Sequence, residues 1–205
     1  MYAPLYNLEK DWKEISKVIR ENSFGILVTT KNGLPLATHI PIELETTDNG
    51  TTVLRGHVAR ANEQWQTFET MEQAMAIFTA PHHYVSSSWY HKMSVPTWNY
   101  IAVHMYGKMK FVNDESLKNS LRKLMDTYEV ISKNPQQLDA LPQDDVDKLM
   151  KGVVGFEMSI DKVEARFKLS QNKDDEDYQR VIHELKALDD YHAKWIAEEM
   201  ERRKV

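Results

Sequence analysis

The stretch FGILVTTKNGLPLATHIPIEL, residues 24–44, decides the fold class of this chain. Its first seven residues are rich in β-branched side chains, and the pair Asn32-Gly33 follows shortly after them. An Asn-Gly pair between two apolar runs is a strong signal for a β-hairpin. The stretch therefore predicts two antiparallel strands joined at Asn32-Gly33.

Further strands are predicted along the chain, separated by polar turns. The run from Ile101 to Phe111 alternates apolar and polar residues, so one of its faces is expected in the core. Pro81 is expected to end the strand predicted at residues 73–81. A tight turn is expected at Asp161-Lys162. The other predicted strands are TTVLRGHV (51–58), QAMAIFTAP (73–81), GVVGFEMSID (152–161) and VEARFKLS (163–170).

Helices are expected between and after these strands, at Leu8–Arg20, within residues 59–71, after an N-cap at Asp114, up to Met150, and from Asp174 to the end. Short antiparallel strands with a few helices indicate a mainly β chain of the α+β class. The expected architecture is a small antiparallel barrel with helical additions. We expect a barrel domain with inserted helices over residues 1–170. A C-terminal helical extension, residues 171–205, is expected to pack on the barrel or on a partner subunit.

The composition excludes several classes of function. The chain has 205 residues, a net charge of -5 and no cysteine, so it has no disulfide, no thiolate nucleophile and no cysteine zinc site. The N-terminus lacks a signal-peptide pattern, and no apolar run approaches the roughly 20 residues that span a bilayer. We therefore expect a cytoplasmic protein without a membrane partner. The negative charge argues against an extended nucleic-acid surface.

Common catalytic and nucleotide-binding motifs are also missing. The sequence has no GxGxxG, no Walker loop, no HExxH and no GxSxG. His82 and His83 are adjacent, so on an extended chain they point to opposite faces, and we predict no metal site. No catalytic residue is identified.

Three segments could bind a ligand. Arg60 lies between a predicted strand and a helix expected near Ala61, which is a suitable anion site, although an exposed arginine at a helix start is also common. The segment 98–100 (Trp-Asn-Tyr) would suit a flat ring or simply form the edge of the core. The segment 166–172 adds cations and polar side chains at a strand end, or it is a strand running into a loop.

Several longer motifs resemble one family. GHVARAN (56–62), VPTWNYIAVHMYG (95–107) and KLSQN (168–172) resemble segments of the PaiB-type proteins, FMN-binding negative transcriptional regulators. FGILVTT, ATHIPI and HHYVSSSWY resemble further segments of that family in the same order. The resemblance implies a split β-barrel of the pyridoxamine-phosphate-oxidase type, a homodimer, and FMN at the subunit interface.

The resemblance also implies a set of FMN-binding residues. Arg60 is expected to bind the phosphate, with Asn62 beside it, and His57 to lie near the phosphate or the ribityl chain. The remaining expected contacts are Thr38, His39 and Ile40 at the polar edge of the ring, Trp98 and Asn99 at the ring or ribityl chain, and Lys168, Ser170 and Gln171 closing the site.

Two functions remain open at this stage. The family resemblance implies repression of sporulation and degradative-enzyme genes, but the sequence shows no helix-turn-helix with a basic recognition helix. DNA is therefore a possible partner, but the sequence shows no recognition helix. The small basic clusters KMK (108–110) and ERRKV (201–205) are of a kind that more often faces solvent than contacts DNA. The alternative is a flavin-dependent oxidoreductase acting on a small substrate, with His39, His57 or His104 as proton donors. Haem binding by a related barrel has only the histidine count in its favour.

Overall fold

The predicted hairpin is present in the computed structural model, which describes residues 1–203. Strands β2 (Phe24–Lys31) and β3 (Leu34–Thr46) pair antiparallel, from Phe24↔Pro41 to Lys31↔Leu34. The turn residues Asn32 and Gly33 have φ values of 52° and 80°. Both values are positive, as the two-residue turns that match strand twist require.

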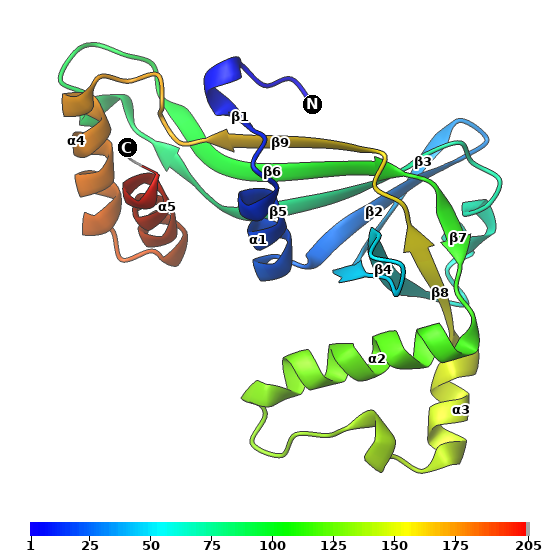
Figure 1. The fold of residues 1–205 in the computed structure, drawn as a ribbon. Coiled ribbons are helices and arrows are strands. Elements are labelled where there is room, and N and C mark those ends of the chain that lie inside the picture. Colours follow the sequence, from blue (N-terminus) through cyan, green and yellow to red (C-terminus); the bar gives the residue numbers. More distant parts are fainter. Residues whose placement is uncertain (204–205) are drawn as a thin grey trace. The chain divides into compact units, whose positions relative to one another are not determined.

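The helices and strands carry the labels of Figure 1. The chain divides into two units, each built from segments that are distant in sequence. Unit 1 holds Met1–Asn22, Phe78–His104 and the chain from Val163 onward, and unit 2 holds Ser23–Ile77 and Met105–Lys162. Strands β5 (Ala74–Val85) and β6 (Thr97–Gly107) each contribute residues to both units.

Unit 2 is an antiparallel sheet with a helical insertion. β2 pairs with β3 and with residues Met75–Ile77 of β5, β3 pairs with β4 (Thr52–Ala59), β4 pairs with β8 (Val153–Met158), and β8 pairs with β7 (Met109–Phe111). The inserted helices are α2 (Asp114–Tyr128) and α3 (Gln143–Gly152), and short 3-10 helices lie at Glu63–Thr67, Glu129–Ile131 and Leu138–Ala140. The core of unit 2 includes Leu27, Ile42, Leu54, Phe68, Phe156 and Met158, all fully buried.

Unit 1 combines three helices with strands. β1 (Leu8–Glu9) pairs with β9 (Lys162–Lys168) through Leu8↔Arg166 and Glu9↔Ala165. The helices are α1 (Trp12–Glu21), α4 (Asp175–Ala187) and α5 (Tyr191–Arg202), with short 3-10 helices at Leu5–Asn7 and Ser87–Trp89. Ile19, Phe78, Ile101, Val103, Phe167, Val181 and Ile196 form its core.

Several expected element boundaries are wrong. Helix α1 begins at Trp12 rather than Leu8, because the Asp11 side chain accepts a hydrogen bond from the Lys13 backbone and caps the helix there. Asn113, not Asp114, caps α2 in the same way. β5 continues through Pro81 to Val85, because its ladder with β2 covers only Met75–Ile77 and Pro81 lies beyond it.

The turn expected at Asp161-Lys162 does not join paired strands. The strand before it, β8, pairs with β4 and β7 in unit 2, and the strand after it, β9, pairs with β1 in unit 1. The helix expected near Ala61 is a five-residue 3-10 helix, Glu63–Thr67, capped by Asn62. Such a short element has no substantial dipole, so the expected anion site loses its helical contribution.

Candidate functional site

The structure separates the residues expected to bind a ligand into two sets. Trp98, Asn99, Lys168, Ser170 and Gln171 belong to unit 1. The set in unit 2 comprises Thr38, His39, Ile40, His57, Arg60 and Asn62.

In unit 2, β3 and β4 diverge beside the expected site. β3 pairs with β2 from Leu34 to Pro41, but its ladder with β4 begins only at Ile42. A polar cluster from the segment after β4 lies next to the open stretch of β3. Asn62 Nδ2 donates to Thr38 Oγ1 at 2.9 Å. The backbone edge of β3 around Thr38 is therefore free of the β4 ladder and bordered by polar side chains.

Gln64 holds this cluster in place, a role that no pattern in the sequence predicts. Its side chain is buried, and its Nε2 donates to the Leu27 carbonyl at 3.0 Å and to the Leu36 carbonyl at 3.3 Å. Thr38 Oγ1 donates to Gln64 Oε1. Through Gln64, the segment that follows β4 is hydrogen-bonded to both β2 and β3.

The structure does not bring all three β3 residues into this cluster. Thr38 and Ile40 are half-buried and point to one face of the strand, whereas His39 is exposed on the other. His57 lies on β4 opposite Gly155 and is half-buried. Burial lowers the pKa of His57, so its imidazole is neutral at physiological pH.

Arg60 is bonded to the backbone of its own unit. Its Nε donates to the Lys151 carbonyl at 2.8 Å and its Nη2 to the Val153 carbonyl at 2.9 Å. Its own carbonyl accepts a hydrogen bond from Trp65 Nε1 at 2.9 Å. Arg60 also lines a cavity of about 580 Å³ that contains Asp114, Glu115, Lys118, Asp147 and Lys151. Its Nη1 is the part of the guanidinium that these carbonyl bonds leave for a ligand.

In unit 1, the segments 97–99 and 168–171 are hydrogen-bonded to each other. Asn99 is fully buried, and its Oδ1 accepts a hydrogen bond from Ser170 Oγ at 3.1 Å. Its Nδ2 contacts Met200 Sδ at 3.5 Å. Lys168 Nζ donates to Thr97 Oγ1. The Gln171 side chain bonds the backbone of Phe167 and Leu169.

Trp98 lies differently from its neighbour Asn99. It is 51% exposed, and its ring lies 5.7 Å from that of His82 and 6.0 Å from that of Tyr84. His83 stacks instead on Trp89, so the two adjacent histidines contact different rings. The described residues, 1–203, contain no group of three or more histidine and acidic side chains placed to hold a metal ion.

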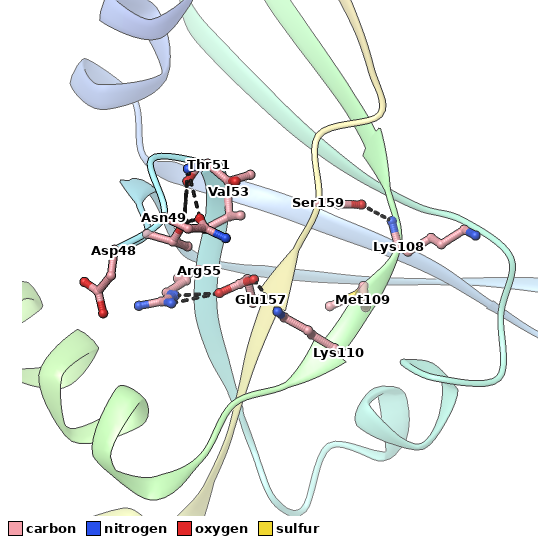
Figure 2. A pocket seen from close by; sticks show the side chains of 11 residues that line it. Asp48, Asn49, Thr51, Val53, Arg55, Lys108, Met109, Lys110, Glu157 and Ser159 are labelled. Atoms are coloured by element: carbon pink, nitrogen blue, oxygen red, sulfur yellow. Dashed lines mark hydrogen bonds and ion pairs between the residues drawn. The ribbon is translucent and has the colours of Figure 1, made fainter.

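Unit 2 also contains a charged cavity that is not among the predicted sites. It has a volume of about 630 Å³ and is lined by Thr47, Asp48, Asn49, Thr51, Val53, Arg55, Lys108, Met109, Lys110, Glu157 and Ser159. Figure 2 shows Arg55 and Lys110 converging on Glu157. The available signal was a single charged residue inside each of two apolar runs, VLRGHV and VVGFEMS.

The terminal basic cluster does not form a free patch within the described residues. Arg202 pairs with Glu14 and Glu199, and Arg203 pairs with Glu9, Glu14 and Glu199. These ion pairs link α5 to α1 and β1 within unit 1. Residues 204 and 205 of the predicted cluster lie outside the described residues.

Comparison with known proteins then assigns the family. Residues 1–162 match the family described as "Putative FMN-binding domain". The chain belongs to this family. It is 41% identical over 201 residues to the protease synthase and sporulation protein PAI 2 of Bacillus subtilis, covering 98% of this chain and 97% of that relative. It is 30% identical to an uncharacterized protein of Emericella nidulans, covering 96% of this chain and 95% of that relative.

Solved structures confirm the fold. A flavocytochrome from Azotobacter vinelandii superposes with a TM-score of 0.63 at 15% identity, covering 85% of this chain and 75% of that chain. An FAD- and haem-binding protein from Mycobacterium smegmatis gives a TM-score of 0.60 at 13% identity, covering 79% and 73%. The expected antiparallel split barrel with helical additions is thereby confirmed. Within residues 1–203, none of the helices has the length and apolar character needed to cross a bilayer.

Proposed function

We propose that this protein binds FMN and acts as a cytoplasmic negative regulator of transcription of the PaiB type. The observation that carries the proposal is the match to the Bacillus subtilis sporulation protein over 98% of the chain. The family description adds the flavin. The open edge of β3 beside Thr38 and Asn62 supports a polar ligand in unit 2.

The residues of unit 2 suit the parts of FMN unequally. The free backbone edge at Thr38–Ile40 offers both donors and acceptors to the polar edge of a ring, and Asn62 holds Thr38 in place. His57, neutral and half-buried, suits the ribityl hydroxyls better than an anion. Bound FMN would supply redox chemistry, while these residues bind and orient it.

Arg60 is the proposed phosphate ligand, with a smaller contribution than a free guanidinium would make. Two of its nitrogens already donate to backbone carbonyls, so a phosphate could bond to Nη1 but not replace both existing bonds without cost. The carboxylates of Asp114, Glu115 and Asp147 line the same cavity and oppose an anion. We therefore expect a modest dependence of FMN affinity on Arg60.

The predicted residues of unit 1 divide by their bonding. The side chains of Asn99, Ser170 and Gln171 form hydrogen bonds within the unit, and we propose that these three residues position their neighbours. Trp98 and Lys168 keep accessible surface, so a ligand can reach them.

We propose a homodimer as the working form. Phe24 and Leu34 on the β2–β3 hairpin are 67% and 69% exposed. The two side chains lie at opposite ends of the hairpin and form no single patch, so the main support for this proposal is the family resemblance, which implies a homodimer. We propose that repression does not depend on a basic recognition helix, since α2 to α5 each carry at least as many acidic as basic side chains and α1 has an excess of only one basic side chain.

The test has separate arms for ligand, assembly and regulation. Titration of FMN into the purified chain should quench flavin fluorescence to a saturable end point, and sedimentation should give a dimer of the 24.0 kDa chain. Expression beside a reporter driven by a sporulation-gene promoter should lower its output. Lack of saturation would reject FMN binding, and unchanged reporter output would reject the regulatory proposal.

A further inference from the structure

Two basic side chains of unit 1, Arg166 and Lys168, lie on the same face of β9. Positions two apart on a strand share a face. In the described part of the chain, neither side chain forms an ion pair: Arg166 Nη1 donates to the Tyr2 carbonyl at 2.9 Å, and Lys168 Nζ donates to Thr97 Oγ1. Burial and the charge of Arg166 both lower the pKa of Lys168. Two cations that repel each other in this way would be stabilised by an anion.

Arg166 also has an unused donor. Its Nε is buried and has no hydrogen-bond partner among residues 1–203. A buried donor without a partner costs free energy, most of all on a charged group. The same guanidinium lies 5.3 Å from the centre of the Tyr100 ring. Arg166 therefore borders an aromatic side chain, and its Nε lacks a hydrogen-bond acceptor.

Tyr100, which contacts Arg166, also lines a cavity. The cavity has a volume of about 300 Å³ and is lined by Thr79, Ala80, His82, Trp98, Tyr100 and Ile101. Ligand pockets span about 300–1,000 Å³, so this one suits a molecule of one or two rings. Half of the Trp98 surface is exposed, which leaves a flat aromatic face for such a ring.

The strands that carry these groups are fixed to each other. Asn99, beside Tyr100, accepts a hydrogen bond from Ser170, two residues after Lys168, at 3.1 Å. Both side chains are buried. A cavity wall and a cation pair held by a buried hydrogen bond keep a constant separation, as a preorganised site requires.

We propose that unit 1 contains a binding site for a small aromatic carboxylate. The ring packs against Trp98 and Tyr100, and the carboxylate accepts hydrogen bonds from Arg166 and Lys168. This ligand is distinct from FMN, and its site uses only residues of unit 1. A regulator with such a site would respond to the concentration of an aromatic acid.

The test is calorimetric titration of the full chain with indole-3-carboxylate and, as a matched neutral probe, indole-3-carboxamide. The acid should bind at least about ten-fold more tightly, since charge-assisted hydrogen bonds are lost with the amide. Lys168→Met and Arg166→Gln should each weaken binding of the acid by about ten-fold and leave the affinity for the amide unchanged. Trp98→Ala should weaken binding of both probes.

Lys173→Met is the control, because Lys173 is another cation of unit 1 that lies over an aromatic ring, Tyr90, and bonds Ser94 outside this cavity. It should leave both affinities unchanged. Equal affinity for acid and amide, no binding of the acid at millimolar concentration, or insensitivity to both cation variants would overturn the proposal. Should Arg166→Gln fail to fold, as judged by circular dichroism, Lys168→Met decides. Displacement of the acid by FMN would place the ring in the flavin site and reject a separate one.

Discussion

Arg55 and Glu157 occupy directly paired positions on β4 and β8, and Arg55 donates through Nε and Nη2 to the same oxygen of Glu157, at 3.1 and 2.8 Å. Lys110 of β7 bonds the other carboxylate oxygen at 2.8 Å. Arg55 also reaches Glu45 of β3 at 3.5 Å, and Lys123 of α2 pairs with Glu45 at 2.7 Å. The alternating charges link four strands and a helix of unit 2 (Figure 2 shows the Arg55–Glu157–Lys110 part).

We predict that Glu157→Gln lowers the stability of the protein. Burial would raise the pKa of Glu157, but hydrogen bonds from Lys110 and Arg55 outweigh it and lower that pKa, so the group is ionised at neutral pH. The neutral amide leaves Arg55 without its main counter-charge. We expect a loss of about 1–3 kcal/mol in the free energy of unfolding, measured by urea denaturation at pH 7.

The matched control is Glu69→Gln, which removes the same charge from an exposed position of unit 2. It should change stability by less than about 0.5 kcal/mol. Replacing Arg55 and Glu157 together by leucine should recover part of the loss, because neither member of the pair is then left without its partner and the buried Glu45 keeps Lys123. A Glu157→Gln protein as stable as the wild type would show that the network contributes nothing.

The protein should lose stability as the pH falls below about 6.5, the ordinary histidine pKa. Burial lowers the pKa of both His57 and His104, in the latter with a further contribution from the N-terminal ammonium and opposition from Glu164. The unfolded chain therefore binds more protons than the folded chain in this range. Stability is fully present above the unfolded pKa and decreases as the pH falls towards and past the folded values.

Urea denaturation at pH 7.5 and pH 5.5 measures this effect. His57→Gln should reduce the difference between the two free energies of unfolding, and the exposed His183→Gln should leave it unchanged. An identical pH difference in wild type and His57→Gln would contradict the assignment to His57.

Ser170 should tolerate glycine better than alanine. Its φ is 62°, in the left-handed region, while its Oγ donates to the buried Asn99. Both substitutions remove the hydrogen bond, but only glycine also removes the backbone strain. We expect Ser170→Ala to be less stable than Ser170→Gly by about 1 kcal/mol, measured by thermal unfolding of both variants. The reverse order would mean that the site is not strained.

Local chemistry explains what the sequence could predict. The hairpin at Asn32-Gly33 follows from two residues that adopt positive φ readily, and the alternation from Ile101 places Val103 and Met105 in the core, as observed. Strand pairing, in contrast, could not be predicted from local sequence. Nothing in the residues around Asp161 shows that β8 and β9 have partners in different units, because those partners lie far away in the sequence.

The contacts among the candidate residues were not predictable for the same reason. The resemblance assigns Thr38 to the ring and Asn62 to the phosphate region, and the structure shows these two side chains hydrogen-bonded to each other. Residue type could not show that Arg60 donates to carbonyls of Lys151 and Val153, since any backbone can accept its bonds. Nor could it show the Arg55–Glu157 pair, because register alone brings those two residues together.

We predict that Arg60 raises the affinity for FMN about ten-fold by bonding its phosphate. One charge-assisted hydrogen bond from Nη1 contributes about 1.5 kcal/mol, whereas a fork with both terminal nitrogens free would give considerably more. Arg60→Ala should therefore weaken FMN by about one decade and leave riboflavin, which has no phosphate, nearly unchanged. Parallel fluorescence titrations of the two flavins on wild type and variant measure this.

Arg60→Ala also removes the hydrogen bonds to Lys151 and Val153, so its structural effect must be separated from its effect on the ligand. Arg60→Lys serves this purpose: it keeps the charge but cannot bond both carbonyls in the same geometry. If it recovers FMN affinity while remaining as unstable as Arg60→Ala, the charge acts on the phosphate. Equal losses for FMN and riboflavin in Arg60→Ala would instead show that Arg60 only supports the backbone between β4 and α3. No loss for either flavin would remove Arg60 from the binding site.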